Sequence, residues 1–142
     1  MRSVTGSLLP GGVMIRRLNP ATVPPPLARY SHGVEVAAGA RLVFCSGQLG
    51  VRADGAIPDS VEAQTEQCFQ NIALILAEAG LGLSDIVRID AFVTARQHMQ
   101  AYMSVRDRLF GDPPPASTLM IVSGFTRPEF LVEVEVVAAG PG

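Results

Sequence analysis

Two glutamates near the end of the chain have the spacing to act together in chemistry. Glu133 and Glu135 alternate with valines in the segment LVEVEVV, so in a strand both carboxylates lie on one face. A carboxylate that borders a cleft can orient or deprotonate a water molecule. The same spacing suits a solvent-facing sheet surface, with Arg88 as a partner on a neighbouring strand. The spacing alone leaves both interpretations open.

The other reactive side chains indicate little catalytic chemistry. Ser31 and His32 are neighbours in a predicted strand and point to opposite faces, so a packed or surface histidine is a better interpretation than a dyad. All basic residues are arginines, which excludes a Schiff base on a lysine. With His98 as the second histidine, no metal site is expected. The sequence contains no glycine motif for phosphates or dinucleotides, and we expect no cofactor.

Composition describes a single soluble globular domain. The chain has 142 residues, of which 48% are hydrophobic and 17% are charged. Its longest apolar run, residues 72–77, is too short to span a bilayer, so no membrane partner is expected. The N-terminus lacks the features of a secretory signal, which predicts a cytoplasmic location with Cys45 and Cys68 reduced and buried. A net charge of −2 without a basic stripe argues against a nucleic-acid partner.

The pattern of apolar and polar residues changes near residue 29. Residues 1–28 lack a periodic pattern and are interpreted as an N-terminal tail and linker, with Met14 as an alternative start. Residues 29–139 are predicted to form the single domain. The runs RYSHGVEV and RLVFCSG, separated by AAGA, predict a hairpin-like pair of strands.

The rest of the domain alternates helices and strands. Asp59 and Glu62 resemble a capping box that opens a helix, and Gly80 suits its end. The periodicity then predicts a strand, a second helix and two final strands, at 86–93, 97–110, 117–123 and 130–138. The order is β-β-α-β-α-β-β. Because two helices cover one face of such a sheet, the other face is expected to be covered by self-association, which allows a pocket built from two chains.

Several stretches together resemble the Rid (YjgF-type) family. They are FCSGQLG, the long segment EAQTEQCFQNIALILAEAGLGLSDIVRIDAFVT, and the ending PPAST…TRPEFLVEVEVVA, all in one register between residues 29 and 139. The resemblance implies an α+β, chorismate-mutase-like fold with a mixed sheet and two helices packed on one face. It also implies a homotrimer with a small-molecule cleft at each subunit interface. Deaminase-type members hydrolyse enamines or imines such as 2-aminoacrylate without a cofactor, whereas other members carry labels such as endoribonuclease.

The resemblance assigns roles to particular residues. The family's water-activating glutamate matches Glu133, which makes it the expected catalytic residue. The substrate-binding positions match residues of four segments, namely Tyr30, Ser46 with Gly47, Met103, and Ala116 with Thr118. The family's asparagine in the second helix is absent, since its register falls on Met103.

The family's substrate-binding arginine is also absent. The family segment P-A-R-S-T corresponds here to residues 114–118, PPAST, so that Ala116 takes the arginine's place. Losing one bidentate, charge-assisted contact costs about 1.5–3 kcal/mol, or roughly ten- to a hundredfold in binding. Arg29, Arg106 and Arg127 are the alternative cations considered. The expected ligand is therefore an imine or enamine other than a 2-imino acid, and the alternative is a non-catalytic ligand-binding or regulatory trimer.

Overall fold

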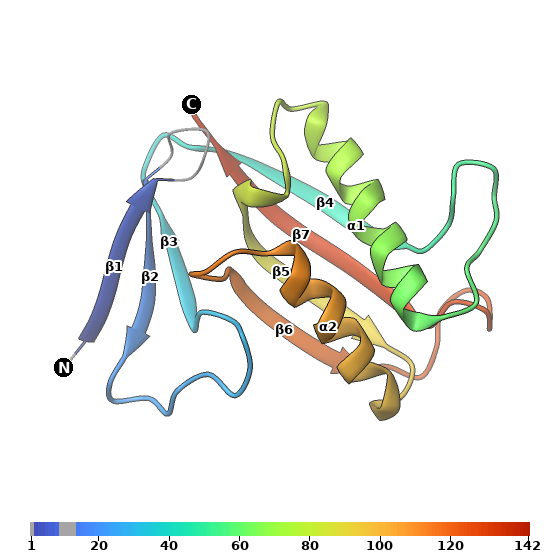
Figure 1. Ribbon diagram of the computed structural model, residues 1–142. Coiled ribbons are helices and arrows are strands. Elements are labelled where there is room, and N and C mark those ends of the chain that lie inside the picture. The colour runs from blue at the N-terminus through green and yellow to red at the C-terminus, as the bar shows by residue number, and fades with distance from the viewer. Residues whose placement is uncertain (1, 9–13) are drawn as a thin grey trace.

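The computed structural model describes residues 2–8 and 14–142, and for residues 2–8 and Met14 the backbone alone. Its strands and helices, in chain order, are β1 (Arg2–Leu8), β2 (Met14–Pro20), β3 (Gly33–Val36), β4 (Arg41–Leu49), α1 (Val61–Ala77), β5 (Ile86–Val93), α2 (Met99–Leu109), β6 (Ala116–Ile121) and β7 (Val132–Gly140) (Figure 1). Short 3₁₀ turns at Leu83–Asp85 and Arg96–His98 precede β5 and α2. No helix of the described part could cross a membrane.

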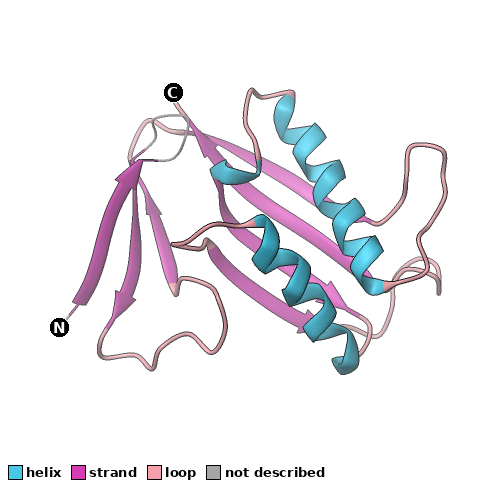
Figure 2. Cartoon of the chain, viewed as in Figure 1, coloured by secondary structure: helices cyan, strands magenta, loops and turns pink. Residues whose placement is uncertain are grey.

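A four-stranded mixed sheet forms the centre of the fold. Its strand order is β4-β7-β5-β6, with β5 and β6 parallel and the other two pairs antiparallel. Both helices lie on the same side of this sheet (Figure 2). The predicted α+β, chorismate-mutase-like class with two helices on one face is confirmed, as is the β-β-α-β-α-β-β order from β3 onward.

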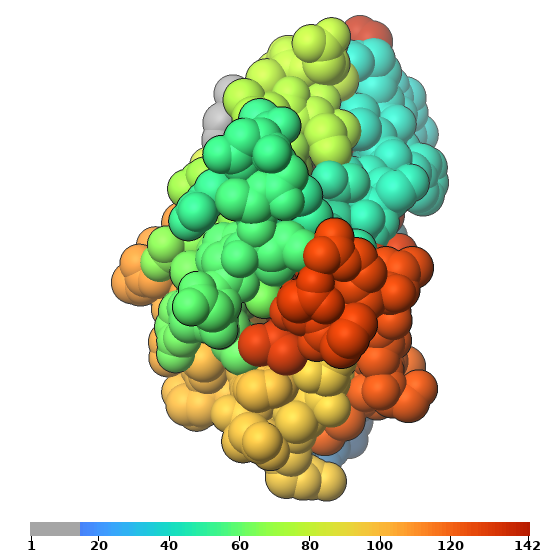
Figure 3. Space-filling model, turned by 90° about the vertical axis from the view of Figure 1, so that its right-hand side faces the viewer, coloured from blue at the N-terminus to red at the C-terminus, as the bar shows by residue number. Residues whose placement is uncertain are grey.

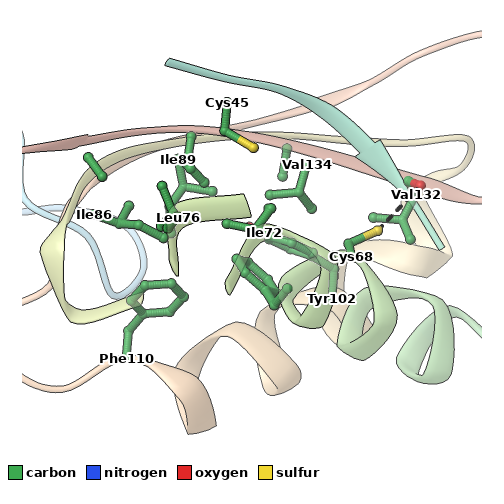
Figure 4. Close-up of a cluster of buried hydrophobic side chains, with 14 of the residues drawn as sticks. Cys45, Cys68, Ile72, Leu76, Ile86, Ile89, Tyr102, Phe110, Val132 and Val134 are labelled. Atoms are coloured by element: carbon green, nitrogen blue, oxygen red, sulfur yellow. Dashed lines mark hydrogen bonds between the residues drawn. The ribbon is translucent and has the colours of Figure 1, made fainter. Parts of the chain in front are cut away.

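The helix-covered face of the sheet holds the main hydrophobic core. On β7, Val132, Val134 and Val136 point toward the helices and are at most 3% exposed. Ile72 and Leu76 of α1 pack against them and are fully buried (Figure 4). Burying each such side chain contributes about 1.5–3 kcal/mol, so this face supplies much of the stability. Cys45 and Cys68 are free and buried within the same cluster, as predicted.

The opposite side of the four-stranded sheet, here called the open face, carries no helix. It receives the alternate side chains of the same strands, including Glu133 and Glu135 of β7 and Arg88 and Asp90 of β5. It also carries large apolar side chains that remain exposed, with Phe44 of β4 at 75%. A polar and partly apolar sheet surface therefore lies uncovered in the single chain.

A second, three-stranded sheet precedes this core in the chain. Its order is β1-β2-β3, all antiparallel (Figure 1). Ile15 of β2 is 1% exposed and packs against Val87 and Ala139, with Val137 alongside, which covers one end of the open face.

The sequence interpretation of residues 1–28 as tail and linker did not anticipate β1 and β2, because their apolar residues are too few to show a period. Part of that segment, Met1 and residues 9–13, lies outside the described residues. The division of the chain into a tail of 1–28 and a domain of 29–139 stays a prediction.

Two local expectations are wrong. The predicted hairpin is absent from the described strands, since β3 pairs with β2 while β4 pairs with β7. The connection turns through Gly39 at a φ of 85°, which takes β4 into the other sheet. The first helix is capped by Ser60 instead of Asp59, because Ser60 is extended and its hydroxyl accepts from the Ala63 amide at 3.1 Å.

Candidate functional site

The pairing of β7, β5 and β6 aligns the predicted site residues of the sheet on the open face. Residues that lie across from one another on these three strands form a row. Glu133 lies across from Phe92 of β5, and Phe92 lies across from Met120 of β6. In the next row Glu135 lies across from Asp90, and Asp90 across from Thr118. In the third row Arg88 lies across from Ala116. Residues paired in this way share a face, so the glutamates, Ala116 and Thr118 belong to one surface.

Glu133 and Gly47 are in direct contact. The pairing of β4 with β7 shifts between Cys45 and Gln48, which places Gly47 in a bulge beside Glu133. A Cβ atom at position 47 would lie 2.7 Å from Glu133 Cδ and 2.8 Å from Oε1. Only glycine therefore lets the carboxylate rest against the backbone of β4 here. Ser46, the preceding bulge residue, is exposed next to this contact.

The surroundings of Glu133 make its carboxyl a weaker acid than that of an exposed glutamate. Partial burial raises the pKa of the Glu133 carboxyl above its ordinary value, and the negative charge of Glu135 raises it further. Among the described residues, no side chain donates a hydrogen bond to Glu133. A carboxylate that is partly desolvated and unpartnered is a stronger base than an exposed one, which suits activation of water.

Gln64 of α1 fixes the backbone that leads into Glu133. Its amide nitrogen donates to the carbonyls of Pro58 and Glu129, both at 2.8 Å, and its amide oxygen accepts from Leu131 N at 2.9 Å. In Figure 3 the start of α1, in green, lies against the loop before β7, in orange-red. Because Gln64 is 1% exposed, these bonds are shielded from water and hold the start of β7 in place.

The proline corner before β6 is tied to the segment before β3. The Ser31 amide donates to the Pro115 carbonyl at 3.0 Å, and its hydroxyl donates to the Pro114 carbonyl at 2.6 Å. Ser31 also bridges to Ala116, which is 6% exposed. Tyr30 is thereby placed beside this corner, and its hydroxyl accepts from the Leu27 amide at 3.3 Å. The backbone of this corner is therefore held by hydrogen bonds, and position 116 carries no charged side chain.

Thr118 lies beside Arg88, for which the sequence suggests only the glutamates as partners. Arg88 instead binds Asp90 of its own strand, with Nε to Oδ2 at 3.1 Å and Nη2 to Oδ1 at 2.8 Å. Nη2 also donates to Thr118 Oγ1 at 3.1 Å. Sequence reasoning missed the Arg88–Asp90 pair, although their two-residue spacing in a strand was a signal for it.

Met103 is the predicted site residue that lies apart from the others. It is on α2 and packs against the core on the helix-covered face, so within one chain the sheet separates it from Glu133. A site containing both residues requires a second subunit.

Each of the three alternative arginines has a partner other than Glu133. Arg106 is 4% exposed, pairs with Asp107 at 3.0 Å and lies over the Tyr102 ring. Arg29 donates to the Asp107 carbonyl at 2.9 Å, next to the same helix. Arg127 pairs with Glu129 in the loop before β7.

The Ser31–His32 pair does not form a dyad. The Ser31 hydroxyl donates to the Pro114 carbonyl, while His32 Nε2 lies 2.7 Å from the Pro24 carbonyl oxygen. Within the described residues, no three histidine, cysteine, aspartate or glutamate side chains form a group suited to a metal ion.

Comparison with known proteins gives consistent matches over most of the chain. The family described as Endoribonuclease L-PSP matches residues 21–140. The chain is 34% identical over 77 residues to the mitochondrial protein mmf2 of Schizosaccharomyces pombe, covering 54% of this chain and 61% of that protein. It is 26% identical to a 2-iminobutanoate/2-iminopropanoate deaminase of Dermatophagoides farinae, covering 84% of this chain and 92% of that protein.

A solved structure supports the same assignment. The crystal structure of YyfB from Yersinia pestis, described as a protein of unknown function of the conserved Rid protein family, superposes with a TM-score of 0.76. It is 29% identical and covers 87% of this chain and 97% of its own.

Proposed function

Because the chain belongs to the Endoribonuclease L-PSP (Rid, YjgF-type) family, we propose that it binds a small organic molecule in a cleft between subunits and hydrolyses an enamine or imine there. The observation that carries this proposal is the Glu133 carboxylate, held against Gly47 on an uncovered sheet face and unpartnered among the described residues. The deaminase from Dermatophagoides farinae supports the reaction class.

The proposed reaction needs only one base and water. An enamine first tautomerises to the imine. Glu133 accepts a proton as the water oxygen attacks the carbon of the protonated C=N bond, which gives a neutral carbinolamine. Glu133 returns this proton to the nitrogen, and it accepts the hydroxyl proton as the C–N bond breaks, so that ammonia and a carbonyl product are released. The backbone around Ser46 and Gly47 places the ligand beside the base, and no cofactor takes part.

The cleft is proposed to form in a homotrimer. On the open face, Leu42, Phe44 and Met120 are 50%, 75% and 49% exposed, and a second subunit would remove this apolar surface from water. A neighbouring subunit would also supply Met103, which one chain keeps away from Glu133. Sedimentation should give about three times the 15.0 kDa chain mass, and a stable monomer at micromolar concentration would contradict the intersubunit cleft.

The ligand is proposed to lack the carboxylate of a 2-imino acid, since Ala116 offers no cation. This same observation favours the second candidate, a non-catalytic ligand-binding or regulatory trimer. The proposal includes no nucleic-acid or membrane partner and a cytoplasmic location. The arginines of five ion pairs are already compensated by acids, which argues against a basic surface for RNA: Arg16–Glu35, Arg88–Asp90, Arg106–Asp107, Arg108–Glu66 and Arg127–Glu129.

Ammonia release from freshly generated imines tests the catalytic proposal. The parent should release ammonia above the uncatalysed rate, and Glu133→Gln should lower that rate about a hundredfold or more, because the base is lost. Glu135→Gln is the matched control, since it removes a neighbouring charge on the same strand. Full activity in Glu133→Gln would exclude Glu133 as the base, and no activity in the parent would favour the binding trimer.

A further inference from the structure

Arg88 carries a guanidinium group in register with position 116, where the family has an arginine and this chain has Ala116. Arg88 lies on β5 directly across from Ala116 on β6, and both side chains are on the open face. Its side chain is 44% exposed, so a ligand on this face can reach it. The site therefore retains an arginine one strand away from the place where the family has one.

Asp90 already engages this guanidinium. The two contacts of Arg88 Nε and Nη2 with the Asp90 carboxylate form a bidentate pair, and Thr118 accepts a further bond from Nη2. A bidentate carboxylate is the contact that a substrate carboxylate would make with a free arginine. Asp90 thus already binds the edge of the Arg88 guanidinium that the carboxylate of a 2-imino acid would need.

The pair lies within reach of a ligand at Glu133. Asp90 is one row from Glu133, since Glu133 is opposite Phe92 and Asp90 precedes Phe92 by two residues. With about 3.3 Å per residue and about 4.8 Å between strands, the two Cα atoms are about 8 Å apart. A small molecule that contacts Glu133 therefore experiences the charge of this pair.

The charges of the open face favour a cation. Once Asp90 compensates Arg88, the carboxylates of Glu133 and Glu135 remain without a compensating cation among the described side chains that share their rows. Resting carboxylates attract a protonated imine and repel a carboxylate.

Resting on the proposed function, we propose that Asp90 determines the specificity of the site: by holding Arg88, it makes the open face accept a cationic iminium and exclude 2-imino acids. Arg17 is the competing cation, because it approaches the same corner from β2 and its Nε donates to the Pro114 carbonyl at 3.4 Å. We favour Arg88 over Arg17 as the arginine that would bind a carboxylate, because Arg88 pairs in register with Ala116.

Binding of two small planar probes tests this proposal without requiring turnover. Acetamidinium represents the cation and pyruvate represents the carboxylate, and their affinities are measured by calorimetry on the oligomer at fixed salt. The parent should bind acetamidinium more tightly than pyruvate. Asp90→Asn, which keeps the shape of the side chain but frees Arg88, should raise pyruvate affinity about tenfold or more and weaken acetamidinium.

Three further variants identify the cation. Arg88→Gln added to Asp90→Asn should remove the gain in pyruvate binding, whereas Arg17→Gln added to it should retain the gain. Glu129→Gln is the matched control, because it frees Arg127, which lies in the loop before β7 and is not paired in the rows of the sheet, and it should leave both affinities unchanged. Loss of the gain with Arg17→Gln alone, or an equal gain from Glu129→Gln, would overturn the role of the Arg88–Asp90 pair.

The imine assay separates this proposal from the proposed hydrolysis. A protein that shows the expected probe preferences but releases no ammonia supports the specificity role and contradicts the hydrolysis. A parent that binds pyruvate as tightly as Asp90→Asn, with the same oligomeric mass and circular dichroism, contradicts the specificity role whatever the hydrolysis assay shows.

Discussion

The two faces of the four-stranded sheet are built from alternate residues of the same strands and differ in almost every property. On β7, Val132, Val134 and Val136 are buried under the helices, while Glu133 and Glu135 between them lie on the open face. The helix-covered face contains aliphatic and aromatic side chains in dense contact (Figure 4). The open face contains carboxylates, an arginine and exposed apolar side chains.

With the proposed function, this difference separates stability from function within one strand. A two-residue period lets one face be selected for packing while the other is free to carry chemistry. The rigid core behind Glu133 also holds its backbone in place, as a catalytic base requires. Substitutions on the helix-covered face should therefore lower stability, whereas substitutions on the open face should change binding, assembly or catalysis.

The largest effect is expected at the centre of the helix-covered face. Ile72→Ala removes a fully buried side chain from α1 and should lower the free energy of unfolding by about 2–5 kcal/mol, because a cavity remains. Urea unfolding measures this change. Probe affinity per folded oligomer should not change, and a variant with parental stability would contradict the assignment of the core to this face.

A methyl group at position 47 should impair the site more than the fold. In Gly47→Ala the new Cβ displaces the Glu133 carboxylate, and a shift of about 1 Å in a catalytic group can lower the rate by up to a hundredfold. We expect kcat/KM for ammonia release to fall by tenfold or more. The control is Gly82→Ala, where a Cβ meets nothing within 4 Å. Equal activity in both variants would show that the Gly47 contact is not needed.

Two equally exposed apolar residues on different surfaces should differ in their effect on assembly. Phe44 on the open face is 75% exposed and Leu74 on α1 is 72% exposed. Phe44→Ser should weaken the trimer by about 1.5–3 kcal/mol per buried side chain, whereas Leu74→Ser should leave assembly unchanged. Sedimentation over a dilution series compares them. Dissociation caused by Leu74→Ser instead would place the interface on the helices.

The smallest effect concerns the proton of Glu133. Because its pKa is raised by burial and by Glu135, the folded protein holds this proton more tightly than the unfolded chain does. Stability should therefore fall as the pH rises from the ordinary glutamate pKa of 4.5 through the raised value, and be constant above it. This contribution of Glu133 is measured as the difference in unfolding free energy between the parent and Glu133→Gln at several pH values in this range. If the parent instead gains stability relative to Glu133→Gln as the pH rises over this range, the pKa of Glu133 is lowered in the folded protein.

Much of the domain was predictable from local patterns. The alternation in β5 and β7 and the helical period of α1 are read directly from spacing. The resemblance predicts Glu133, Gly47 and Ala116 as site positions, and their roles stay predictions. The strands β1 and β2 were missed, because they gain their stability from pairing and from contacts such as that of Ile15 with Ala139. Such contacts are distant in sequence and leave no local period.

The sequence by itself therefore determined the order of elements from β3 onward, the buried face of β5 and β7 and the presence of two carboxylates on one surface. Only the tertiary structure decided which strand lies beside which, and so placed Glu133 against Gly47 and Arg88 beside both Asp90 and Ala116. The physical reason is that a side chain's period depends on its own strand, whereas its neighbours depend on long-range register. For this protein that register is the basis of the proposed specificity of the site.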